Sequence, residues 1–545
     1  MAHTSCAICG QDGEFGAKQP KVTCTSWNTT TVPCPNCVQV KALDEHIEEA
    51  RAYIRHLKAH RAALRRGANT FHDPFTTLVP IEIASKILCF CVDGEEFKRR
   101  IPLVLSAVSK RWQVIAHSTP LLWASIRLRV YPRSSRYSYE DMLRHWLQRS
   151  SQYPISIDLQ VGSFTHYTRE ELENQYRPII EILNAHCHRW RKLSVAMPIH
   201  LLGLLKGNFN GKPLLSHLEI RGTDPDDDND EGSQNWKFDL GTSLPAPHIV
   251  SISECRTQRI HINWCNVTNL FLRFYRPHEI FALLKAAPLL RECRLEGLLD
   301  DVQAASDYQD LPVVHHNLIK FHIEIWDVSL SPLFGGLCFP NLNSLFYSGS
   351  HASMTPHVSF LLRSSCPIKS LTIHLSSDSD HRAELFDILW AVPTLERLEI
   401  KGVCPFDNFF QLLADDEGGL KQRRFLPSLM EISQDRPHSW TGTFTWKDIS
   451  KAVKTRASQH RAERGLPVLK RFWWDLHVSH LPEFDDGFYI DEGSVRVFEQ
   501  LRADGIDIKL TNHYNEKGRR DMIVYSRAYH DAKREREKKQ STSDD

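Results

Sequence analysis

The sequence predicts an α/β protein in which a small N-terminal helical module precedes a solenoid, with a curved parallel sheet inside and helices outside. Three observations predict this class. A short unit that starts with proline and is rich in leucine recurs along the chain, its copies are regularly spaced, and apolar segments with helical periodicity lie between them. Before the first copy, two short amphipathic helices carry more apolar residues than so small a unit can bury.

The composition is that of an ordinary globular protein. Of 545 residues, 41% are hydrophobic and 24% are charged, and the formal net charge is +1, which favours neither nucleic acid nor an anionic membrane. No apolar run approaches the roughly 18–20 residues of a membrane span, and the start lacks the pattern of a signal peptide. The 14 cysteines are too dilute for a disulfide scaffold. We therefore expect a soluble protein of the cytoplasm, the nucleus or both.

The first segment, residues 1–40, is rich in cysteine. It holds two CxxC pairs, and each pair can aim two thiolates at one metal ion. Its prolines and glycines give it little means of building a core without a metal. We expect one structural zinc ion, or else a tail with incidental thiols, and no other cofactor. The four candidate ligands are Cys6, Cys9, Cys34 and Cys37.

Residues 41–67 are predicted to form an amphipathic helix. Apolar residues recur at alternating steps of four and three, with Arg61 as the one charged residue in the stripe, and Gly67 is a natural stop. The helix is either a short coiled coil that dimerises the protein or a helix packed on the next domain. We favour packing, because three heptads are marginal for an isolated coiled coil. The apolar residues of the stripe are Leu43, Ile47, Ala50, Ile54, Leu57 and Leu64.

Residues 74–125 are predicted to form a compact helical unit. Pro80 is well placed to start its first helix, where the missing N–H costs nothing, and Ile83, Ile87 and Phe90 share one face of that helix. A polar connector follows, and then a second helix with apolar residues at helical spacing. Residues 118–120 are a helix-start signal for a third turn. The second helix is predicted to run through Val104, Val108, Trp112 and Ile115.

This unit resembles the F-box, whose usual pattern is Leu-Pro-x-Glu-Ile/Leu, an Ile three or four residues later, Val-Cys-Lys-x-Trp, and a later Leu-Trp. The chain departs from that pattern at Val79, Ala84 and Ser109, where Leu, Leu and Cys are common, and these changes shrink the apolar face. The matching residues are Pro80-Ile81-Glu82-Ile83, Ile87, Val108-Ser109-Lys110-Arg111-Trp112 and Leu122-Trp123.

By this resemblance, the unit binds an adaptor of the Skp family and through it a cullin, which attaches a substrate receptor to a ubiquitin ligase. The alternative is that the same residues only fill a local three-helix core. The resemblance assigns the adaptor contact to Leu78, Pro80, Ile83, Ile87, Val108, Trp112 and Leu122.

Residues 126–515 are predicted to form the solenoid. The unit Pro-x-Leu-x-x-Leu-x-Leu is clearest at 213–220, 288–295, 340–347, 393–400 and 467–474. Its second leucine falls at 270, 293, 321, 345, 371 and 398, so the steps of 23 to 28 residues lie in the leucine-rich-repeat range. Each unit supplies a short strand, and helices fit between strands at 279–288 and 384–393. The whole arrangement resembles fungal F-box proteins with leucine-rich repeats; an ordinary α/β domain is the alternative. Weaker copies centre on Leu193, Ile252, Leu270, Phe321, Leu371 and Ile432.

The side chains between the leucines should face the concave surface, because successive residues of a strand point to opposite faces. They mix both signs of charge with aromatic rings, which suits a protein partner better than a phosphate backbone, although solvated strand faces have the same composition. The candidate target-binding residues are Arg221, Arg294, Glu296, Glu324, Arg397, Glu399 and Trp473.

The last segment, residues 516–545, is basic, and we expect a solvated, frayed tail rather than a nuclear-localisation patch. The chain has no Walker loop, no G-x-G-x-x-G after a strand, no H-E-x-x-H and no G-x-S-x-G, so we do not expect an enzyme. We expect a substrate receptor whose helical unit docks the adaptor and whose repeats bind an unknown target protein. A repeat scaffold without a ligase role and a zinc-dependent nucleic-acid binder are the alternatives.

Overall fold

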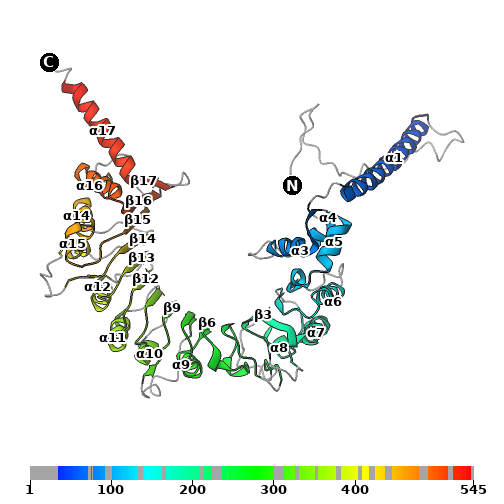
Figure 1. Ribbon diagram of the computed structural model, residues 1–545, viewed down its shortest axis with the longest axis horizontal. Coiled ribbons are helices and arrows are strands. Elements are labelled where there is room, and N and C mark those ends of the chain that lie inside the picture. Colours follow the sequence, from blue (N-terminus) through cyan, green and yellow to red (C-terminus); the bar gives the residue numbers. More distant parts are fainter. Residues whose placement is uncertain are drawn as a thin grey trace. The chain divides into compact units, whose positions relative to one another are not determined.

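The computed structural model shows a mixed α/β fold that divides into two compact units, Met1–Thr119 and Pro120–Asp545 (Figure 1). Among the residues described, no helix is long and apolar enough to cross a membrane. The described residues are 35–71, 75, 78–91, 101–131, 139–162, 167–207, 213–223, 236–241, 244–299, 312–325, 331–349, 354–375, 382–402, 408–415, 424–435, 445–477, 489–513 and 519–541.

The longest helix of the first unit is α1 (Pro35–Phe71). It extends beyond both predicted boundaries, and Gly67, the predicted stop, lies inside it. The apolar stripe along α1 stays open to solvent: Leu43 is 60% exposed, Ile47 47% and Leu64 62%. The packing of this helix on the next domain, which the sequence favoured, is therefore not observed among the described residues.

Three shorter helices of the first unit form what we call the helical module: α3 (Ile81–Phe90), α4 (Ile101–Val108) and α5 (Lys110–His117). The prediction of one continuous helix from Val104 to Ile115 was wrong. The chain is extended at Ser109, with φ −153° and ψ 166°, and the Ser109 hydroxyl accepts a hydrogen bond from the Trp112 N–H at 3.1 Å. Serine favours this N-cap position, because its oxygen satisfies a donor that the first turn of a helix leaves free.

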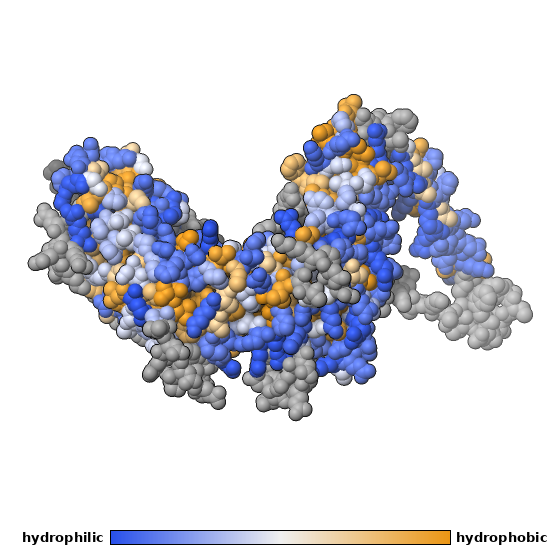
Figure 2. Space-filling model, turned by 60° about the horizontal axis from the view of Figure 1, so that its bottom comes forward, coloured by the Kyte–Doolittle hydropathy of each residue, from blue (hydrophilic) through white to orange (hydrophobic). Residues whose placement is uncertain are grey.

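The core of the helical module is small. Ala84, Leu88, Ile115 and Ala116 are at most 2% exposed, and few other apolar side chains of the three helices are buried. Figure 2 shows hydrophobic surface gathered over these helices. A three-helix unit of this size has too little interior for its apolar residues, so much of its hydrophobic surface faces solvent.

The second unit is built on a 15-stranded sheet, in which the described strands follow chain order and every neighbouring pair is parallel except the last. A separate two-stranded sheet pairs β8 (Val313–Val314) with β10 (Leu337–Cys338). The strands of the large sheet are β1 (Ser125–Val130), β2 (Ile155–Val161), β3 (Trp190–Met197), β4 (His217–Gly222), β5 (Ile249–Ser253), β6 (Asn269–Tyr275), β7 (Glu292–Leu298), β9 (Lys320–Ile325), β11 (Ser344–Gly349), β12 (Ser370–Leu375), β13 (Arg397–Lys401), β14 (Glu431–Asp435), β15 (Arg471–His477), β16 (Asp507–His513) and β17 (Arg519–Asp521).

Helices alternate with these strands and cover one face of the sheet, while the other face lines the inside of the curve of this unit (Figure 1). The helical segments predicted at 279–288 and 384–393 are confirmed, each shifted by two residues. The helical elements of this unit are η2 (Pro120–Trp123), α6 (Tyr139–Arg149), α7 (Arg169–Asn184), η3 (Cys187–Arg189), α8 (Ile199–Leu202), η5 (Thr257–Arg259), η6 (Trp264–Asn266), α9 (Pro277–Ala286), α10 (Ser331–Gly335), α11 (Thr355–Ser364), α12 (Arg382–Ala391), α13 (Phe409–Ala414), α14 (Trp446–Arg456), α15 (Gln459–Glu463), α16 (Glu492–Ala503) and α17 (Met522–Ser541).

One buried position repeats in register across the parallel strands, and we call this row the core ladder. Ten of the eleven predicted repeat centres lie on it. The eleventh, Ile252, is two residues too late, because Val250 is the residue that pairs with Leu218. Every member is at most 3% exposed, so each strand buries its apolar side chain against the next. The ladder consists of Ile126, Ile157, Leu193, Leu218, Val250, Leu270, Cys293, Phe321, Leu345, Leu371, Leu398, Ile432, Phe472 and Ile508.

Where the step between repeat centres lengthens to 40 residues, from Ile432 on β14 to Phe472 on β15, buried arginines order the insertion. The guanidinium of Arg456, 1% exposed, donates to the carbonyl oxygens of Leu413 at 2.7 Å, Leu426 at 2.8 Å and Phe425 at 2.5 Å. Arg461, fully buried, donates to Pro467 and Pro427 in the same way. These charged donors satisfy backbone carbonyls in the last turn of α13 and in irregular segments that no strand pairs, which keeps the solenoid continuous across the insertion.

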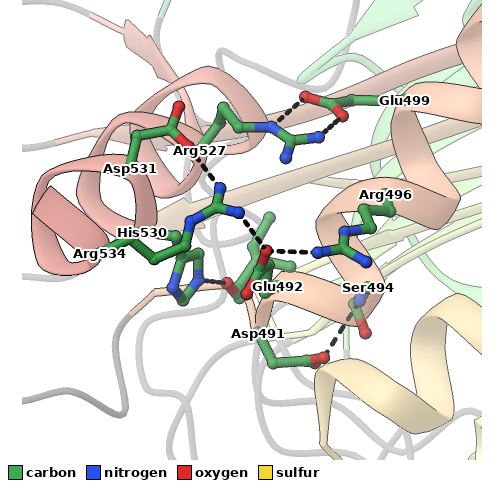
Figure 3. A network of polar contacts seen from close by, with 10 residues as sticks. Asp491, Glu492, Ser494, Arg496, Glu499, Arg527, His530, Asp531 and Arg534 are labelled. Carbon is green, nitrogen blue, oxygen red and sulfur yellow. Dashed lines mark hydrogen bonds and ion pairs between the residues drawn. The ribbon is translucent and has the colours of Figure 1, made fainter. Parts of the chain in front are cut away.

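The C-terminal segment caps the sheet. The prediction of a frayed tail was wrong for Met522–Ser541, which forms α17, because the first turns of that helix are apolar enough to be buried: Met522 and Ile523 are each 1% exposed. Charged pairs join α17 to α16 (Figure 3): the Arg527 guanidinium contacts the Glu499 carboxylate, and Arg534 lies 3.2 Å from Glu492. A parallel solenoid needs such an end, because its last strand would otherwise expose the core ladder.

Candidate functional site

The adaptor-binding residues predicted on α3 and beside it lie on the exposed side of that helix. Ala84 and Leu88 are buried on one face of α3, whereas Ile83 is 46% exposed and Ile87 41% exposed on the other. Leu78, just before the helix, is 80% exposed, and Pro80 is exposed at its N-cap. This division of α3 into a buried face and an open apolar face is typical of a helix that meets a partner.

The other predicted contacts of the module differ in exposure. Val108, at the end of α4, is 46% exposed, and Val104 on the same helix is 59% exposed. Trp112 is half-buried, and its ring lies 5.0 Å from that of Phe75, centroid to centroid. Trp112 therefore supports the module as well as contributing to its surface.

Leu122 is the one predicted adaptor contact that the structure does not leave accessible. It is 1% exposed, and its neighbour Trp123 is fully buried. Both lie in η2, in the second unit, where the Trp123 ring packs edge-on against Trp146 of α6 at 4.9 Å. The predicted unit of residues 74–125 therefore extended too far, and Leu122 belongs to the core at the N-terminal end of the sheet.

The predicted target-binding residues all lie on the sheet face opposite the core ladder, as the strand alternation required. Arg221 is exposed on β4 and belongs to neither of the groups that the other residues form. The remaining six gather in two places, one on β7 and β9 and the other on β12 to β16.

The group on β7 and β9 is an ion network. The Arg294 guanidinium lies 2.5 Å from the Glu296 carboxylate and 3.4 Å from that of Glu324. A His322 ring nitrogen lies 2.6 Å from Glu324, and the ring stacks on Phe346 with centroids 3.8 Å apart. Burial holds the pKa of His322 below its usual value, although the bond to Glu324 opposes this shift. These charges satisfy one another, so the group offers a partner little that is unpaired.

The group on β12 to β16 lines a hollow of about 510 Å³, which we call the C-terminal hollow. It contains three predicted residues, Arg397, Glu399 and Trp473. Its middle row runs across the strands in register: Thr372, Glu399, Ser433, Trp473 and Lys509. Because Ser433 is short and its neighbours on both sides are long, the floor is depressed there.

Charged side chains and the Trp473 ring hold one another in place around the C-terminal hollow. The Arg471 guanidinium lies 4.7 Å from the Trp473 ring centroid and the Lys509 ammonium 3.8 Å from it. Arg471 is fixed by Glu431 at 2.8 Å and Asp507 at 3.4 Å. The indole N–H of Trp473 is buried and has no hydrogen-bond partner in the described part of the chain. A ring held by its neighbours loses little freedom on binding, which favours Trp473 as an anchor for a protein partner.

Sequence reasoning missed the lining residues of the C-terminal hollow that come from two of its strands. Glu431, Ser433 and Asp435 come from β14, whose repeat copy is weak, and Lys509 and Thr511 come from β16, where no copy was recognised. The alternation around Ile508, in the sequence Asp-Ile-Lys-Leu-Thr, was the signal that could have located β16.

The predicted zinc ligands Cys6, Cys9 and Cys34 lie outside the described residues, and the structure gives the backbone of Cys37 at the start of α1 without describing its side chain. Within the described ranges, no group of three or more His, Cys, Asp or Glu side chains could hold a metal ion. The zinc site stays a prediction.

When the chain is compared with known protein families and with curated proteins, neither comparison finds a match.

Proposed function

We propose that this protein is a non-enzymatic substrate receptor of the F-box type, which docks a Skp-family adaptor through its helical module and binds a target protein through its repeats. The observation that carries the proposal is the open apolar face of the helical module. Leu78, Ile83, Ile87 and Val108 are 41–80% exposed, in the motif order that resembles the F-box. An apolar face of this kind gains free energy when a partner covers it.

Two of the three departures from the F-box pattern, Ala84 and Ser109, fit this proposal. Ala84 is fully buried, so the small residue sets how closely α3 packs inside the module rather than what the partner meets. Ser109 caps α5, a role that a cysteine would perform poorly. Neither change removes an exposed apolar residue from the face.

The solenoid of the second unit, which we call the array, supports the target-binding half of the proposal. Its curved parallel sheet and regular core ladder support a leucine-rich-repeat type of solenoid, whose inner surface commonly holds a protein partner. We assign target binding to the C-terminal hollow, because it combines a depression, paired charges of both signs and a positioned tryptophan. The mechanism is proximity: the receptor raises the concentration of a target lysine near the activated ubiquitin that other subunits carry.

Co-purification with a Skp-type adaptor tests the docking half. We expect the wild-type chain to retain the adaptor and the variant Ile83→Asp, Ile87→Asp to lose it at least tenfold, because two charges would be desolvated at the contact. Val524→Asp is the matched control, since Val524 is 63% exposed on α17 and lies outside the module. Equal retention by all three proteins would falsify the docking site, and a chain that binds its targets without any adaptor would instead be a repeat scaffold.

The target half has its own test. Trp473→Ala should remove a set of co-purifying proteins while the adaptor stays bound, because the two surfaces lie in different units. Arg221→Ala is the control, since it truncates an exposed residue of the same sheet face outside both groups. If both variants recover the same proteins as the wild type, the C-terminal hollow does not bind the target.

A further inference from the structure

The apolar stripe on α1 is a heptad repeat that no described residue of the chain buries. Position a is held by Val40, Ile47, Ile54 and Arg61, and position d by Leu43, Ala50, Leu57 and Leu64. The six large apolar residues among these are 46–62% exposed. The stripe therefore spans about 36 Å of one helix face, at 1.5 Å per residue.

The charges of α1 are divided between its two halves. Residues 41–50 hold Asp44, Glu45, Glu48 and Glu49 against one lysine, whereas residues 51–66 hold six Lys or Arg and no acid. Two such helices side by side in parallel would oppose acid to acid and base to base. Placed antiparallel, each acidic half meets a basic half, which is the favourable arrangement at this spacing.

We propose that α1 pairs with α1 of a second copy of this chain as an antiparallel two-stranded coiled coil. The side chains also fix the register. In an antiparallel pair, position a of one helix faces position d of the other. Placing Ile54 opposite Leu57 of the second copy sets Ile47 opposite Leu64 and Arg61 opposite Ala50.

This register accommodates Arg61, the one charged residue of the apolar stripe. Ala50 is the only small residue in the layers from Ile47 to Leu64, and it leaves room for the long side chain of Arg61. Glu48 and Glu49 lie in the same turn as Ala50, at the outer positions b and c, so the Arg61 side chain of one copy leaves the seam toward a turn of the other copy that carries two acids. In a parallel pair Arg61 would face Arg61 of the other copy. Two like charges within an apolar seam destabilise the pair, which disfavours the parallel orientation.

The test uses the full-length chain and three single variants in sedimentation equilibrium. We expect the wild type to be a dimer of 62.9 kDa chains at micromolar concentration. Ala50→Lys should weaken the dimer at least tenfold, because it opposes lysine to Arg61. Ala50→Glu should keep or tighten the dimer, because it opposes a carboxylate to the same arginine. Ala59→Lys, the same change on the opposite helix face, should leave the dissociation constant unchanged.

The direction in which each variant changes the dissociation constant distinguishes an antiparallel pair from a parallel one. In a parallel pair Ala50 faces Ala50, so lysine and glutamate would weaken the dimer alike, and that result would overturn the proposal. A wild-type monomer up to about 50 µM, or a dimer indifferent to Ala50→Lys, would overturn it as well. Ala, Lys and Glu are all strong helix formers, and Ala50 and Ala59 are both exposed, so none of the three changes should unfold α1.

Discussion

The two units of the protein treat apolar residues in opposite ways. In the second unit the core ladder places one apolar side chain per strand at 3% exposure or less, from Ile126 to Ile508. In the first unit comparable side chains, such as Ile83 and Val108, are each 46% exposed. The difference follows from repetition, because each inner strand of the sheet has a neighbour on both sides, whereas no described element of the first unit covers the open face of the three-helix module.

The comparison teaches where each unit can bind. The apolar residues of the array are buried in its core, and the sheet face opposite the core ladder presents charged side chains, a shallow hollow and Trp473. The helical module offers apolar contact area instead. A partner of the module should therefore bind through apolar burial, and a partner of the array through paired charges and one aromatic anchor.

The largest expected effect comes from truncating the core ladder. Phe321 is 1% exposed and packs edge-on against Phe334 and Phe339, so Phe321→Ala should cost about 3–5 kcal/mol of unfolding free energy. Ile83→Ala, in the open face of the module, should cost less than about 1 kcal/mol. Urea unfolding of both variants measures the difference. Similar losses would mean that the face of the module is covered within the chain and would remove the contrast between the units.

A smaller effect should follow where the array departs from its regular period. Arg456→Met keeps the apolar stem but removes the donor to the backbone carbonyls of Leu413, Phe425 and Leu426, so we expect a loss of about 3 kcal/mol of unfolding free energy. Lys454→Met is the matched control on the same helix, since Lys454 is exposed. The melting temperatures of the two variants measure the loss of stability. A shift no larger than that of the control would show that the insertion does not depend on the buried guanidinium.

The parts of the fold that could be predicted are those with a repeating signal. The copies from Leu270 to Leu398 located their strands correctly, because every copy buries its leucine in the same environment. Strands β1, β2 and β16 escaped recognition, because the ends of a solenoid pack against a different neighbour and do not need the full motif. For the same reason the buried first turns of α17 were taken for a polar tail.

The misjudged residues of the candidate sites share one cause. Leu122 and Ile83 are both apolar and follow the same motif, but only the arrangement of η2 beside α6 decides that Leu122 is buried. Likewise, the depression at Ser433 depends on which long side chains lie across the neighbouring strands. Spacing along one strand predicts the face of a side chain, whereas its neighbours come from strands about 25 to 40 residues away in sequence.

The smallest effect we predict is a pH dependence of the array. Burial holds the pKa of His186, His217 and His322, all in the second unit, below the usual value near 6.5. The unfolded chain therefore binds protons more tightly at these sites than the folded chain does. Above about pH 6.5 these histidines are neutral in both states, and the free energy of unfolding is unaffected by their burial. As the pH falls from there toward the lowered folded-state pKa values, the unfolded chain takes up protons first, so the free energy of unfolding decreases.

Melting temperatures of the wild type and of His322→Gln, measured from pH 7.5 to 5.5, isolate one of these groups. Carboxylates change the stability of both proteins alike, so the variant should show a shallower decline, with the difference appearing below about pH 6.5. A steeper decline in the variant would mean that the bond to Glu324 outweighs burial and that His322 is charged in the folded state. In that case the ion network around Arg294 would carry one more positive charge, and the array would present a more basic centre to its partner than the geometry now indicates.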